Sequence, residues 1–390
     1  MKNMYDIIVV GGGPAGATAA KYAAMGGATV LLLEKDRDIG YPVRCAEGVG
    51  SQGLKKFMEP DEEWIANRID GFRLIAPNGS AVEVVPGDIG YILNRKIFDY
   101  ELARRAGEVG AHIYTKAYVF DLISKNGRVS GVKVNYMGDT VEVHSEVVIG
   151  ADGVESRVGR WAGINTVTKL KDMETCVQMT ITNINIDKKY CDFYFGRKVA
   201  PGGYLWVFPK NENTANVGLG ISGNYSKNKS ALKYLREFVD WKYPGGSILT
   251  TVCGGVPCAR TLKRISADGI MLVGDAARQT NPIHGGGIIP AMMAGKLAGE
   301  IAAEAIRKGD NSSSILKKYD EKWDKILGRL HRTFYRLKEG IMKLSDDDLN
   351  RTADSLKHLP GDEISFFSIF KTALIKQPKL LLDVIKAFSS

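Results

Sequence analysis

The 390-residue sequence lacks any run of ~20 uncharged apolar residues, the length that a helix needs to cross a bilayer. Its first apolar stretch, residues 5–10, contains an aspartate and runs directly into glycines, so it is interpreted as a strand and not as a signal peptide. Cysteine is scarce, with five residues at positions 45, 176, 191, 253 and 258. This odd and scattered set argues against a disulfide framework and for a reducing interior. Cys253 and Cys258 have no second pair to complete a zinc site, so no metal is expected.

Acidic residues are outnumbered, with 53 Lys and Arg against 44 Asp and Glu and a formal net charge of +9. General solubility explains most of this excess. Residues 306–343, however, hold 11 Lys and Arg against 5 Asp and Glu in a segment that is expected to be helical. Such a face favours phosphate-bearing partners or an anionic membrane surface. No nucleic-acid-binding fold accompanies the charge, so nucleic acid is not expected as a partner.

The hydrophobic pattern predicts an α/β fold that begins with a Rossmann-like unit. Residues 7–10 and 29–33 are continuous apolar runs, typical of strands buried on both faces, and the Ala-rich residues 14–26 between them have helical spacing. A helix over 96–109 is expected next, followed by strands near 112–123, 128–136 and 140–150. The dipeptides Asn126-Gly127 and Gly138-Asp139 predict the hairpin turns between these strands. Parallel-sheet character returns at 269–273, before an Ala-rich helix over 288–306.

Between about 170 and 253 the pattern changes to alternating polar and apolar residues, which predicts an inserted antiparallel sheet. The expected strands cover residues 177–185, 190–195, 204–208 and 215–221. The tail from residue 311 is expected to be helical. The sequence therefore predicts a discontinuous nucleotide-binding domain over 1–60, 91–169 and 254–310, a substrate-binding antiparallel sheet domain over 61–90 and 170–253, and a C-terminal helical region over 311–390.

The segment Gly11-Gly-Gly13-Pro-Ala-Gly16 fits the pattern G-x-G-x-x-G between the first strand and the first helix. Gly11 permits the tight turn, Gly13 lets the backbone approach a pyrophosphate, and Gly16 lets helix and strand pack closely. The helix N-terminus then offers free N–H groups to the phosphates. Glu34 closes the second strand, where an acid binds the hydroxyl pair of an unphosphorylated ribose. The loop predicts FAD or NAD in preference to NADP, and a glycine-rich turn without a ligand is the alternative.

Two later motifs favour FAD over NAD. Gly150-Ala-Asp152-Gly153-x-x-Ser156 follows an expected strand, and Gly274-Asp275-Ala-Ala forms an acidic turn after residues 271–273. In such a turn the Asp275 carboxylate can hold a ribityl hydroxyl, while the glycines at 285–287 bring backbone N–H groups to the pyrimidine edge of a flavin. A plain helix N-cap is the alternative role of Asp275, and it can coexist with ligand binding.

With these three motifs, in this order, the sequence resembles the flavoprotein superfamily that includes aromatic hydroxylases and geranylgeranyl reductases. Two further segments resemble archaeal geranylgeranyl reductases, also called digeranylgeranylglycerophospholipid reductases. These are residues 40–48, with the sequence GYPVRCAEG, and residues 201–209, with the sequence PGGYLWVFP. The resemblance runs from residue 4 to about residue 345 and makes the first domain an FAD-binding domain. The residues after it resemble nothing specific.

The resemblance implies a set of FAD-binding residues drawn from several segments. They are Gly11, Gly13, Ala15, Gly16 and Glu34 for the adenosine diphosphate half; Arg44, Cys45, Ala46 and Gly48 by the isoalloxazine, with Arg95 beside the cofactor; Val119 beside the adenine; and Asp275, Gly287 and Ile288 to complete the site. His284 departs from the pattern, which has a small hydroxyl residue before the glycines. A histidine there can titrate near neutral pH, although an ordinary surface residue is the favoured interpretation.

The resemblance also implies the chemistry, which is reduction of an isolated C=C bond in a geranylgeranyl chain by hydride from flavin N5 and a proton from the other side. Positive character then develops on the more substituted carbon. Tyr204, Trp206 and Phe208 alternate on one face of an expected strand and are either core residues or, by the resemblance, the lining of a polyprenyl tunnel. Aromatic faces stabilise such a charge by ~1–2 kcal/mol each. Tyr204, Trp206 and Cys45, whose thiolate the neighbouring Arg44 favours, are the expected catalytic residues.

Two other classes of function stay open. The superfamily motifs alone permit a flavin monooxygenase that hydroxylates a small aromatic compound. A non-catalytic flavoprotein or lipid carrier would instead keep its flavin oxidised. The protein is expected to be a monomer, and its electron donor is expected to be a ferredoxin-like protein or NAD(P)H, because nothing marks a second dinucleotide site.

A polyprenyl phospholipid does not leave its bilayer freely, so a cytoplasmic protein in peripheral contact with the inner membrane surface is expected. The basic segment 306–343 and an amphipathic basic tail offer the means. The apolar tail residues are 364–370, Leu374, Ile375 and 380–382, interspersed with Lys371, Lys376, Lys379 and Lys386, and Pro378 breaks the tail in two. A terminal helix packed on the protein's own core shows the same stripe and is the alternative.

Overall fold

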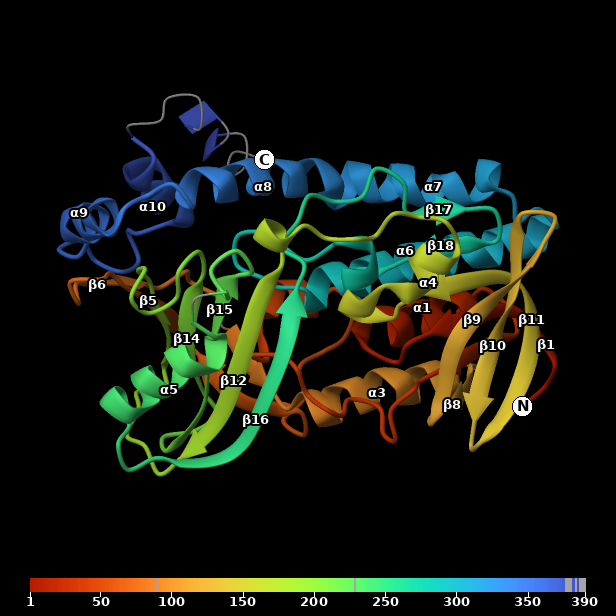
Figure 1. Ribbon diagram of the computed structural model, residues 1–390, viewed down its shortest axis with the longest axis horizontal. Coiled ribbons are helices and arrows are strands. Elements are labelled where there is room, and N and C mark those ends of the chain that lie inside the picture. Colours follow the sequence, from red (N-terminus) through yellow and green to blue (C-terminus); the bar gives the residue numbers. More distant parts are fainter. Residues whose placement is uncertain (89, 228, 376–380, 383, 386–390) are drawn as a thin grey trace.

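The computed structural model of the chain describes residues 1–88, 90–227, 229–375, 381–382 and 384–385. Figure 1 shows an elongated molecule with a large sheet toward each end and long helices along one side. The first sheet has the strand order β17-β18-β11-β1-β2-β8. These strands are Ser266–Ala267, Ile270–Leu272, Asp139–Gly150, Met4–Val10, Val30–Leu33 and His112–Tyr114. Strands β11, β1, β2 and β8 run parallel to one another, which the apolar runs at 7–10 and 29–33 predicted for β1 and β2.

Helix α1 (Pro14–Met25) follows β1 and packs along α6 (Ile288–Lys308). Two glycines of α6 allow the backbones to approach closely. A Cβ atom at Gly295 would lie 2.3 Å from the carbonyl oxygen of Ala15, and one at Gly299 would lie 2.5 Å from that of Ala19. This contact explains why glycines interrupt an otherwise Ala-rich helix, and it fixes α1 and α6 against each other.

A hairpin of β9 (Ala117–Lys125) and β10 (Arg128–Tyr136) extends the first sheet by antiparallel pairing with β11. Its turn lies at Asn126-Gly127, as predicted, with positive φ angles of 52° and 77°. The next turn lies at Met137-Gly138, with φ angles of 55° and 102°, one residue before the predicted Gly138-Asp139. The difference has a simple cause, since a two-residue turn of this kind places glycine at its second position.

The second sheet has the strand order β16-β12-β15-β14-β13-β5-β6. Its strands are Ser247–Val256, Glu174–Thr182, Thr214–Ser222, Tyr204–Pro209, Tyr190–Tyr194, Gly71–Ile75 and Ala81–Val84. The pairing of β13 with β5 is parallel, so the sheet is mixed and not purely antiparallel as predicted. Helix α5 (Ala231–Lys242), which the sequence did not predict, covers one face and shares an apolar core with β12, β14 and β15. Strand β16 was also missed.

Shorter elements connect the two sheets. Strands β3 (Gly48–Gly50), β7 (Gly90–Leu93) and β4 (Ile65–Ile69) form a small third sheet. Helix α2 (Ser51–Leu54) follows β3, and helix α3 (Arg95–Glu108) follows β7. Helix α4 (Arg157–Trp161) follows β11. The division into three domains stays a prediction, because sheet membership does not by itself define domain boundaries.

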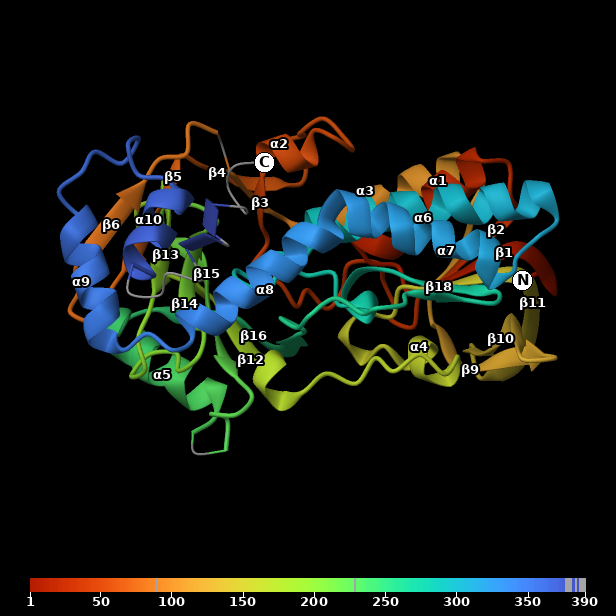
Figure 2. The same cartoon turned by 90° about the horizontal axis from the view of Figure 1, so that it is seen from above.

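The C-terminal region is helical, as predicted. Helix α7 (Ser313–Trp323), a π-helical turn (Asp324–Gly328) and α8 (Arg329–Ile341) form one rod that runs from the first sheet to the second (Figure 2). Helices α9 (Asp346–Leu356) and α10 (Phe366–Ala373) then fold against the second sheet. Within the described ranges, no helix has both the length and the apolar character that a membrane crossing needs.

The described part of the tail has buried and exposed apolar side chains. Leu374 and Val384 are buried against Leu337 of α8, whereas Ile375 and Leu382 are 63% and 60% exposed. The tail thus packs partly on the protein's own core and presents other apolar residues to solvent. Lys376, Pro378, Lys379, Leu380 and Lys386, which the sequence assigned to the amphipathic tail, lie outside the described residues.

Candidate active site

The loop between β1 and α1 has the geometry that close approach of a pyrophosphate requires. Gly11 has a φ of 108°, and a Cβ atom there would lie 2.4 Å from the carbonyl oxygen of Ala151. A Cβ at Gly16 would lie 1.9 Å from the carbonyl oxygen of Gly11, so both positions need glycine. A Cβ at Gly13, by contrast, would meet no atom of the described protein within 4 Å. Within the described residues α1 has no side-chain N-cap hydrogen bond, so its first N–H groups stay free for a ligand.

Glu34 directly follows β2 and holds the same loop. Its Oε2 accepts a hydrogen bond from the Gly12 N–H at 2.7 Å, and its Oε1 accepts one from the Asp36 N–H at 2.9 Å. Each carboxylate oxygen keeps a further lone pair, so Glu34 can also accept a ribose hydroxyl. The Ala117 N–H donates to the Glu34 carbonyl oxygen at 2.8 Å, which brings the start of β9, and with it the buried Val119, to this edge of the sheet.

The 3₁₀ turn after β18 begins close to the N-terminus of α1. Gly274–Ala277 forms a 3₁₀ turn, and a Cβ at Gly274 would lie 3.0 Å from the Cβ of Ala15. Asp275 does not cap this turn; its Oδ1 accepts a hydrogen bond from the Thr280 hydroxyl, and burial raises its pKa. The plain N-cap interpretation of Asp275 was therefore wrong.

Gly287 and Ile288 begin α6 beside that aspartate. A Cβ at Gly287 would lie 3.1 Å from the Thr280 Oγ1 and 3.5 Å from the Asp275 Oδ1. No side chain caps α6 either. The structure thus brings Ala15, Asp275, Gly287 and Ile288 together around two uncapped helix N-termini, which is a fit for the diphosphate and ribityl parts of FAD.

Cys45 is half-buried in the loop before β3. Its carbonyl oxygen accepts a hydrogen bond from Gln178 Nε2 at 2.9 Å, and its Sγ accepts one from the Glu47 N–H at 3.2 Å. Burial raises the pKa of the Cys45 thiol, and the neighbouring Arg95 offsets this only in part. The neutral thiol, and not the expected thiolate, is therefore the favoured form. The cation that acts on Cys45 is Arg95, whereas the side chain of Arg44 is exposed.

Arg95 begins α3 and is fixed by a bidentate ion pair. Its Nε and Nη2 lie 2.6 and 2.7 Å from the carboxylate oxygens of Asp99. Burial disfavours the guanidinium charge, but the Asp99 carboxylate outweighs this effect and raises the pKa of Arg95. The side chain stays charged beside the Cys45 loop.

Glu47 is a buried site residue that the sequence reasoning did not single out. Its Oε1 accepts the Arg95 backbone N–H at 2.8 Å, and its Oε2 lies 2.6 Å from both Asn216 Nδ2 and Lys210 Nζ. Its position within segment 40–48 was visible, but its burial and its partners were not. Through Glu47 the loop that carries Cys45, Ala46 and Gly48 is attached to α3 and to the second sheet.

The aromatic residues of β14 lie on the sheet face opposite α5. Leu205 and Val207 belong to the core under α5, so Tyr204, Trp206 and Phe208 point the other way. The Trp206 Nε1 donates to Gln178 Oε1 at 3.0 Å, and Gln178 in turn bonds the Cys45 carbonyl. A Cβ at Gly48 would lie 2.8 Å from the Phe208 ring. This face therefore meets the Cys45 loop. Trp206 is also 8% exposed, and Phe208 packs against the apolar cluster of Ile69, Ile92 and Cys191, so the tunnel lining stays a prediction beside the core interpretation.

Further rings extend this aromatic face. The ring centroid of Phe193 on β13 lies 5.5 Å from that of Tyr204 and 5.4 Å from that of Phe208. Phe195 lies 6.1 Å from Tyr204. Five aromatic side chains thus form one wall, which we define as the aromatic wall: Phe193 on β13, Phe195 directly after it, and Tyr204, Trp206 and Phe208 on β14.

Tyr204 also reaches the loop before α6. Its hydroxyl donates to the carbonyl oxygen of His284, and burial raises its pKa, so the phenol stays protonated. His284 is exposed, in line with the favoured interpretation of an ordinary surface residue, although desolvation by the surrounding protein lowers its pKa to about 4. A pKa of about 4 favours the neutral imidazole near pH 7. Its Nδ1 accepts the Gly286 N–H at 3.1 Å and shapes the glycine run.

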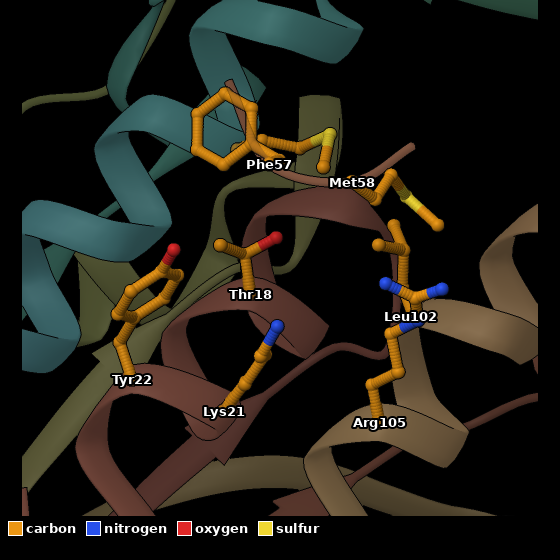
Figure 3. Close-up of a pocket in the computed structure, with 8 residues that line it drawn as sticks. Thr18, Lys21, Tyr22, Phe57, Met58, Leu102 and Arg105 are labelled. Carbon is orange, nitrogen blue, oxygen red and sulfur yellow. The ribbon is translucent and has the colours of Figure 1, made fainter. Parts of the chain in front are cut away.

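Two cavities lie away from this site. Figure 3 shows one between α1 and α3, lined by Thr18, Lys21, Tyr22, Phe57, Met58, Leu102 and Arg105 together with Met292. Its volume of about 10 Å³ suits one water molecule at most, so it holds neither a flavin nor a lipid. A cavity of about 380 Å³ lies on the α5 side of the second sheet, where Arg73 pairs with Asp192. Among the residues that the structure describes, no three His, Cys, Asp or Glu side chains gather as metal ligands would.

Comparison with known proteins shows which protein family the chain belongs to. The chain is 47% identical to the digeranylgeranylglycerophospholipid reductase of Methanocella arvoryzae, over 99% of both chains. This chain belongs to the digeranylgeranylglycerophospholipid reductase family. It is also 46% identical to digeranylgeranylglycerophospholipid reductase 2 of Methanococcoides burtonii, over 98% of this chain and 96% of that one. The predicted family resemblance is confirmed.

Family models and solved structures agree with membership in this reductase family. Residues 172–256 match the model of the geranylgeranyl reductase catalytic domain, and residues 5–189 match that of pyridine nucleotide-disulphide oxidoreductases. A geranylgeranyl bacteriochlorophyll reductase-like protein from Thermoplasma acidophilum superimposes with a TM-score of 0.93 at 36% identity, over 99% of this chain and 100% of that one. The flavin-dependent brominase Bmp2 shares the fold at a TM-score of 0.70 and 18% identity, over 96% of this chain and 99% of that one. The predicted fold class is confirmed, and these matches support FAD as the cofactor.

Proposed function

We propose that the chain is an FAD-dependent reductase that saturates C=C bonds in the geranylgeranyl chains of archaeal membrane (phospho)lipids. The observation that carries this proposal is the meeting of the aromatic wall with the Cys45 loop, in a chain 47% identical to a digeranylgeranylglycerophospholipid reductase. An apolar wall beside a flavin site suits a polyprenyl chain, because such a chain offers only apolar contacts to the protein.

The FAD-binding residues divide between the two helix N-termini and the Cys45 loop. We infer that the adenosine diphosphate half is held by Gly11, Gly13, Ala15, Gly16 and Glu34, with Val119 beside the adenine. The ribityl chain and the pyrimidine edge are held by Asp275, Gly287 and Ile288. The residues by the isoalloxazine are Arg44, Cys45, Ala46, Gly48 and Arg95. The open space above Gly13 and the uncapped N–H groups support this division. When bound and reduced, the cofactor supplies two electrons and one hydrogen as hydride.

The protein's own contribution is orientation, exclusion of water and stabilisation of charge. We infer that Tyr204 and Trp206 present ring faces to the alkene, where each stabilises developing positive charge by ~1–2 kcal/mol when desolvated. The Tyr204 hydroxyl is held by the His284 carbonyl and the Trp206 N–H by Gln178, so both rings are fixed before the substrate binds. We infer that Cys45 acts as a neutral thiol that positions the reacting chain, with its proton retained on Sγ.

Anaerobic incubation of the chemically reduced protein with geranylgeranyl lipids, followed by mass spectrometry, tests the proposal. The expected product gains two hydrogens for each double bond reduced. A hydroxylated product with stoichiometric oxygen consumption would instead identify a monooxygenase of a small aromatic compound. Lipid that is bound but unchanged would identify a lipid carrier.

We further propose that the protein acts as a monomer at the inner membrane surface, with electrons from a ferredoxin-like protein or NAD(P)H. Exposed Ile375 and Leu382 flank residues that pack against Leu337 and against Ile283, which directly precedes His284 at the site. Apolar tail residues next to the site support lipid uptake from a membrane. Much of the charge of segment 306–343 is paired, since Lys308 and Lys318 share Glu304 and Arg332 pairs with Asp324. The tail is therefore the favoured contact.

A further inference from the structure

The face of the second sheet that carries the aromatic wall also carries an acid. Side chains alternate along β12, so Glu174, Cys176 and Gln178 all point to the face on which Gln178 bonds the Cys45 carbonyl. Across the sheet, Cys176 is in register with Gly220 of β15, and Gly220 is in register with Tyr204. On this face the Trp206 ring covers Gly218, where an added Cβ would lie 2.5 Å from the ring, and the Cys176 thiol covers Gly220, where an added Cβ would lie 3.1 Å from Sγ. Glu174 lies on the same face, at the end of β12 nearest Tyr204.

Glu174 is buried and only half satisfied. It is 8% exposed, and its Oε1 lies 3.3 Å from the Nζ of Lys338 on α8. Lys338 also donates to the Cys258 carbonyl oxygen at 2.8 Å. Within the described ranges, the Glu174 Oε2 is buried without any hydrogen-bond partner. It lies toward Gly203, where an added Cβ would be 3.4 Å away, next to Tyr204. A purely structural ion pair would be expected to satisfy both oxygens.

The other ionisable groups in this part of the site are poor proton donors near pH 7. Burial raises the pKa of Cys176 to about 12 and raises those of Cys258, Cys45 and Tyr204 as well. His284, with a pKa of about 4, carries no proton to give at that pH. Burial raises the pKa of Glu174 to about 7, although Lys338 acts in the opposite direction. A general acid works best when its pKa is near the working pH.

We propose that Glu174 is the general acid that delivers the proton to the substrate alkene, with Lys338 as the residue that positions it. This inference rests on the reductase function proposed above. The charged and titratable groups that interact with Glu174 come from several elements: Lys338 on α8, Asp172 before β12, Cys176 on β12, Tyr204 on β14, and Cys258 after β16.

The reaction balances with this assignment. The C=C π bond breaks, and its electron pair forms a C–H bond with the proton of the Glu174 carboxyl group, whose O–H electrons remain on the carboxylate. The other carbon, which carries positive character, forms its C–H bond with the hydride delivered from the reduced flavin. The alkene is reduced by two electrons and the flavin is oxidised by two. The Glu174 carboxylate, beside the Lys338 ammonium group, then regains a proton from solvent.

The test uses Glu174→Gln, which keeps the shape of the side chain and an acceptor for Lys338 but has no acidic proton. We expect single-turnover alkene reduction to fall about 100-fold, the lower range for loss of a general acid. FAD content and geranylgeranyl lipid binding should stay unchanged. Glu321→Gln on the exposed side of α7 is the matched control and should behave as wild type.

Two measurements distinguish a general acid from a structural carboxylate. Infrared titration of the FAD-loaded protein should show a carboxyl band that disappears with an apparent pKa of about 7 and is absent from Glu174→Gln. The rate of alkene reduction should fall as pH rises through the same value, because the acid must be protonated. In Lys338→Met, both the loss of the carboxyl band and the fall in the rate of alkene reduction should occur at higher pH, since the ammonium group of Lys338 lowers the pKa of Glu174.

The outcomes separate the two proposals. If wild type reduces the lipid and Glu174→Gln does so equally fast, Glu174 is not the acid and the reductase function stands. If wild type reduces no geranylgeranyl lipid, the reductase function fails and the acid role fails with it. If Glu174→Gln loses FAD or unfolds, Lys338→Met decides, because a rate limb that does not move overturns the proposal.

Discussion

The indole N–H of Trp206 on β14 donates a hydrogen bond to Oε1 of Gln178 on β12, at 3.0 Å. The bond passes over the intervening strand β15 at Gly218, where an added Cβ would lie 2.5 Å from the Trp206 ring. Gln178 then donates to the Cys45 carbonyl oxygen at 2.9 Å. One side-chain amide thus fixes the ring of the proposed charge-stabilising residue relative to the proposed flavin loop. Because the bond is made without substrate, the ring is already oriented when the alkene binds.

Trp206→Leu keeps an apolar wall but removes the aromatic face. We expect turnover to fall about tenfold, since the loss of ~1.4 kcal/mol of charge stabilisation raises the barrier by that factor. Lipid affinity should change little, because the charge develops only in the transition state. Trp206→Phe is the control, since it keeps an aromatic face but loses the bond to Gln178 and the larger indole ring over Gly218. Single-turnover rates and lipid Kd values check this, and an effect confined to Kd would reduce Trp206 to a wall residue.

Cys45→Ser should slow alkene reduction with little change in melting temperature, because Ser keeps the size and the acceptor for the Glu47 N–H. Burial raises the pKa of the Cys45 thiol, so Cys45 should react slowly with iodoacetamide near pH 7. Exposed Cys253 should be alkylated first. Mass spectrometry of tryptic peptides over time gives the order of modification. Unchanged turnover in Cys45→Ser would show that Cys45 only packs in the loop and has no role in catalysis.

Gly13→Val should leave a folded protein that retains no FAD. Gly13 has extended backbone angles that any residue adopts, and an added Cβ meets no protein atom within 4 Å, so stability without cofactor should change by less than ~1 kcal/mol. The added side chain fills the space assigned to the pyrophosphate. Gly16→Val is the contrasting variant, because its Cβ would lie 1.9 Å from a carbonyl oxygen, and it should fail to fold. Flavin absorbance after purification measures the FAD content of each variant. Full FAD occupancy in Gly13→Val would refute the assignment of this loop to the pyrophosphate.

Local sequence patterns predicted the parts of the fold that depend on neighbouring residues. The order β1-α1-β2, the Gly11-x-Gly13-x-x-Gly16 turn and the placement of Glu34 follow from spacing over 34 residues, and the structure has each where it was predicted. The alternation of Tyr204, Trp206 and Phe208 likewise placed them on one face, because a strand has a period of two. The alternation does not show which residues these rings contact, and in the structure they face Gln178 and the Cys45 loop.

Groups that meet only in the folded chain could not be predicted from such patterns. Glu174 and Lys338 are 164 positions apart in the sequence, and neither lies in a motif that indicates a pair. Arg44 was chosen as the cation beside Cys45 because it is adjacent in sequence, whereas the backbone turns Arg44 outward and α3 brings Arg95 in. Adjacency along a loop says little about side-chain contact, and burial, which reverses the expected thiol chemistry, is not visible in the sequence.

His331 on α8 should make stability sensitive to acid. Its Nε2 donates to the Thr280 carbonyl oxygen at 2.9 Å, and burial lowers its pKa to about 4, below the ordinary 6.5. The unfolded chain therefore binds more protons between these values, and stability is lost as pH falls from about 6.5 toward 4. Between pH 7 and pH 5, the free energy of unfolding measured in urea should therefore fall by ~2 kcal/mol less in His331→Gln than in wild type. His358→Gln at an exposed site is the control, and equal losses in all three proteins would contradict the prediction.

The full-length protein should co-sediment with anionic liposomes at low salt through its described tail. Truncation near residue 358 is a poor test, because it removes the buried Ile364 and Leu374 together with the exposed residues. The double variant Ile375→Glu and Leu382→Glu changes only side chains that are 63% and 60% exposed. Each apolar side chain that enters a membrane contributes ~1.5–3 kcal/mol, so the variant should lose at least 100-fold in liposome affinity.

The matched control is Met137→Glu, because Met137 is 65% exposed at the turn between β10 and β11, at the other end of the molecule (Figure 1). It carries the same change from apolar to acidic and should sediment as wild type. Rising ionic strength should weaken wild-type binding only in part, since salt screens the exposed Lys371 and leaves apolar contacts intact. Melting temperature and FAD content check that all variants are folded. If the tail variant sediments like wild type, or if Met137→Glu loses binding equally, the described tail is not the membrane contact.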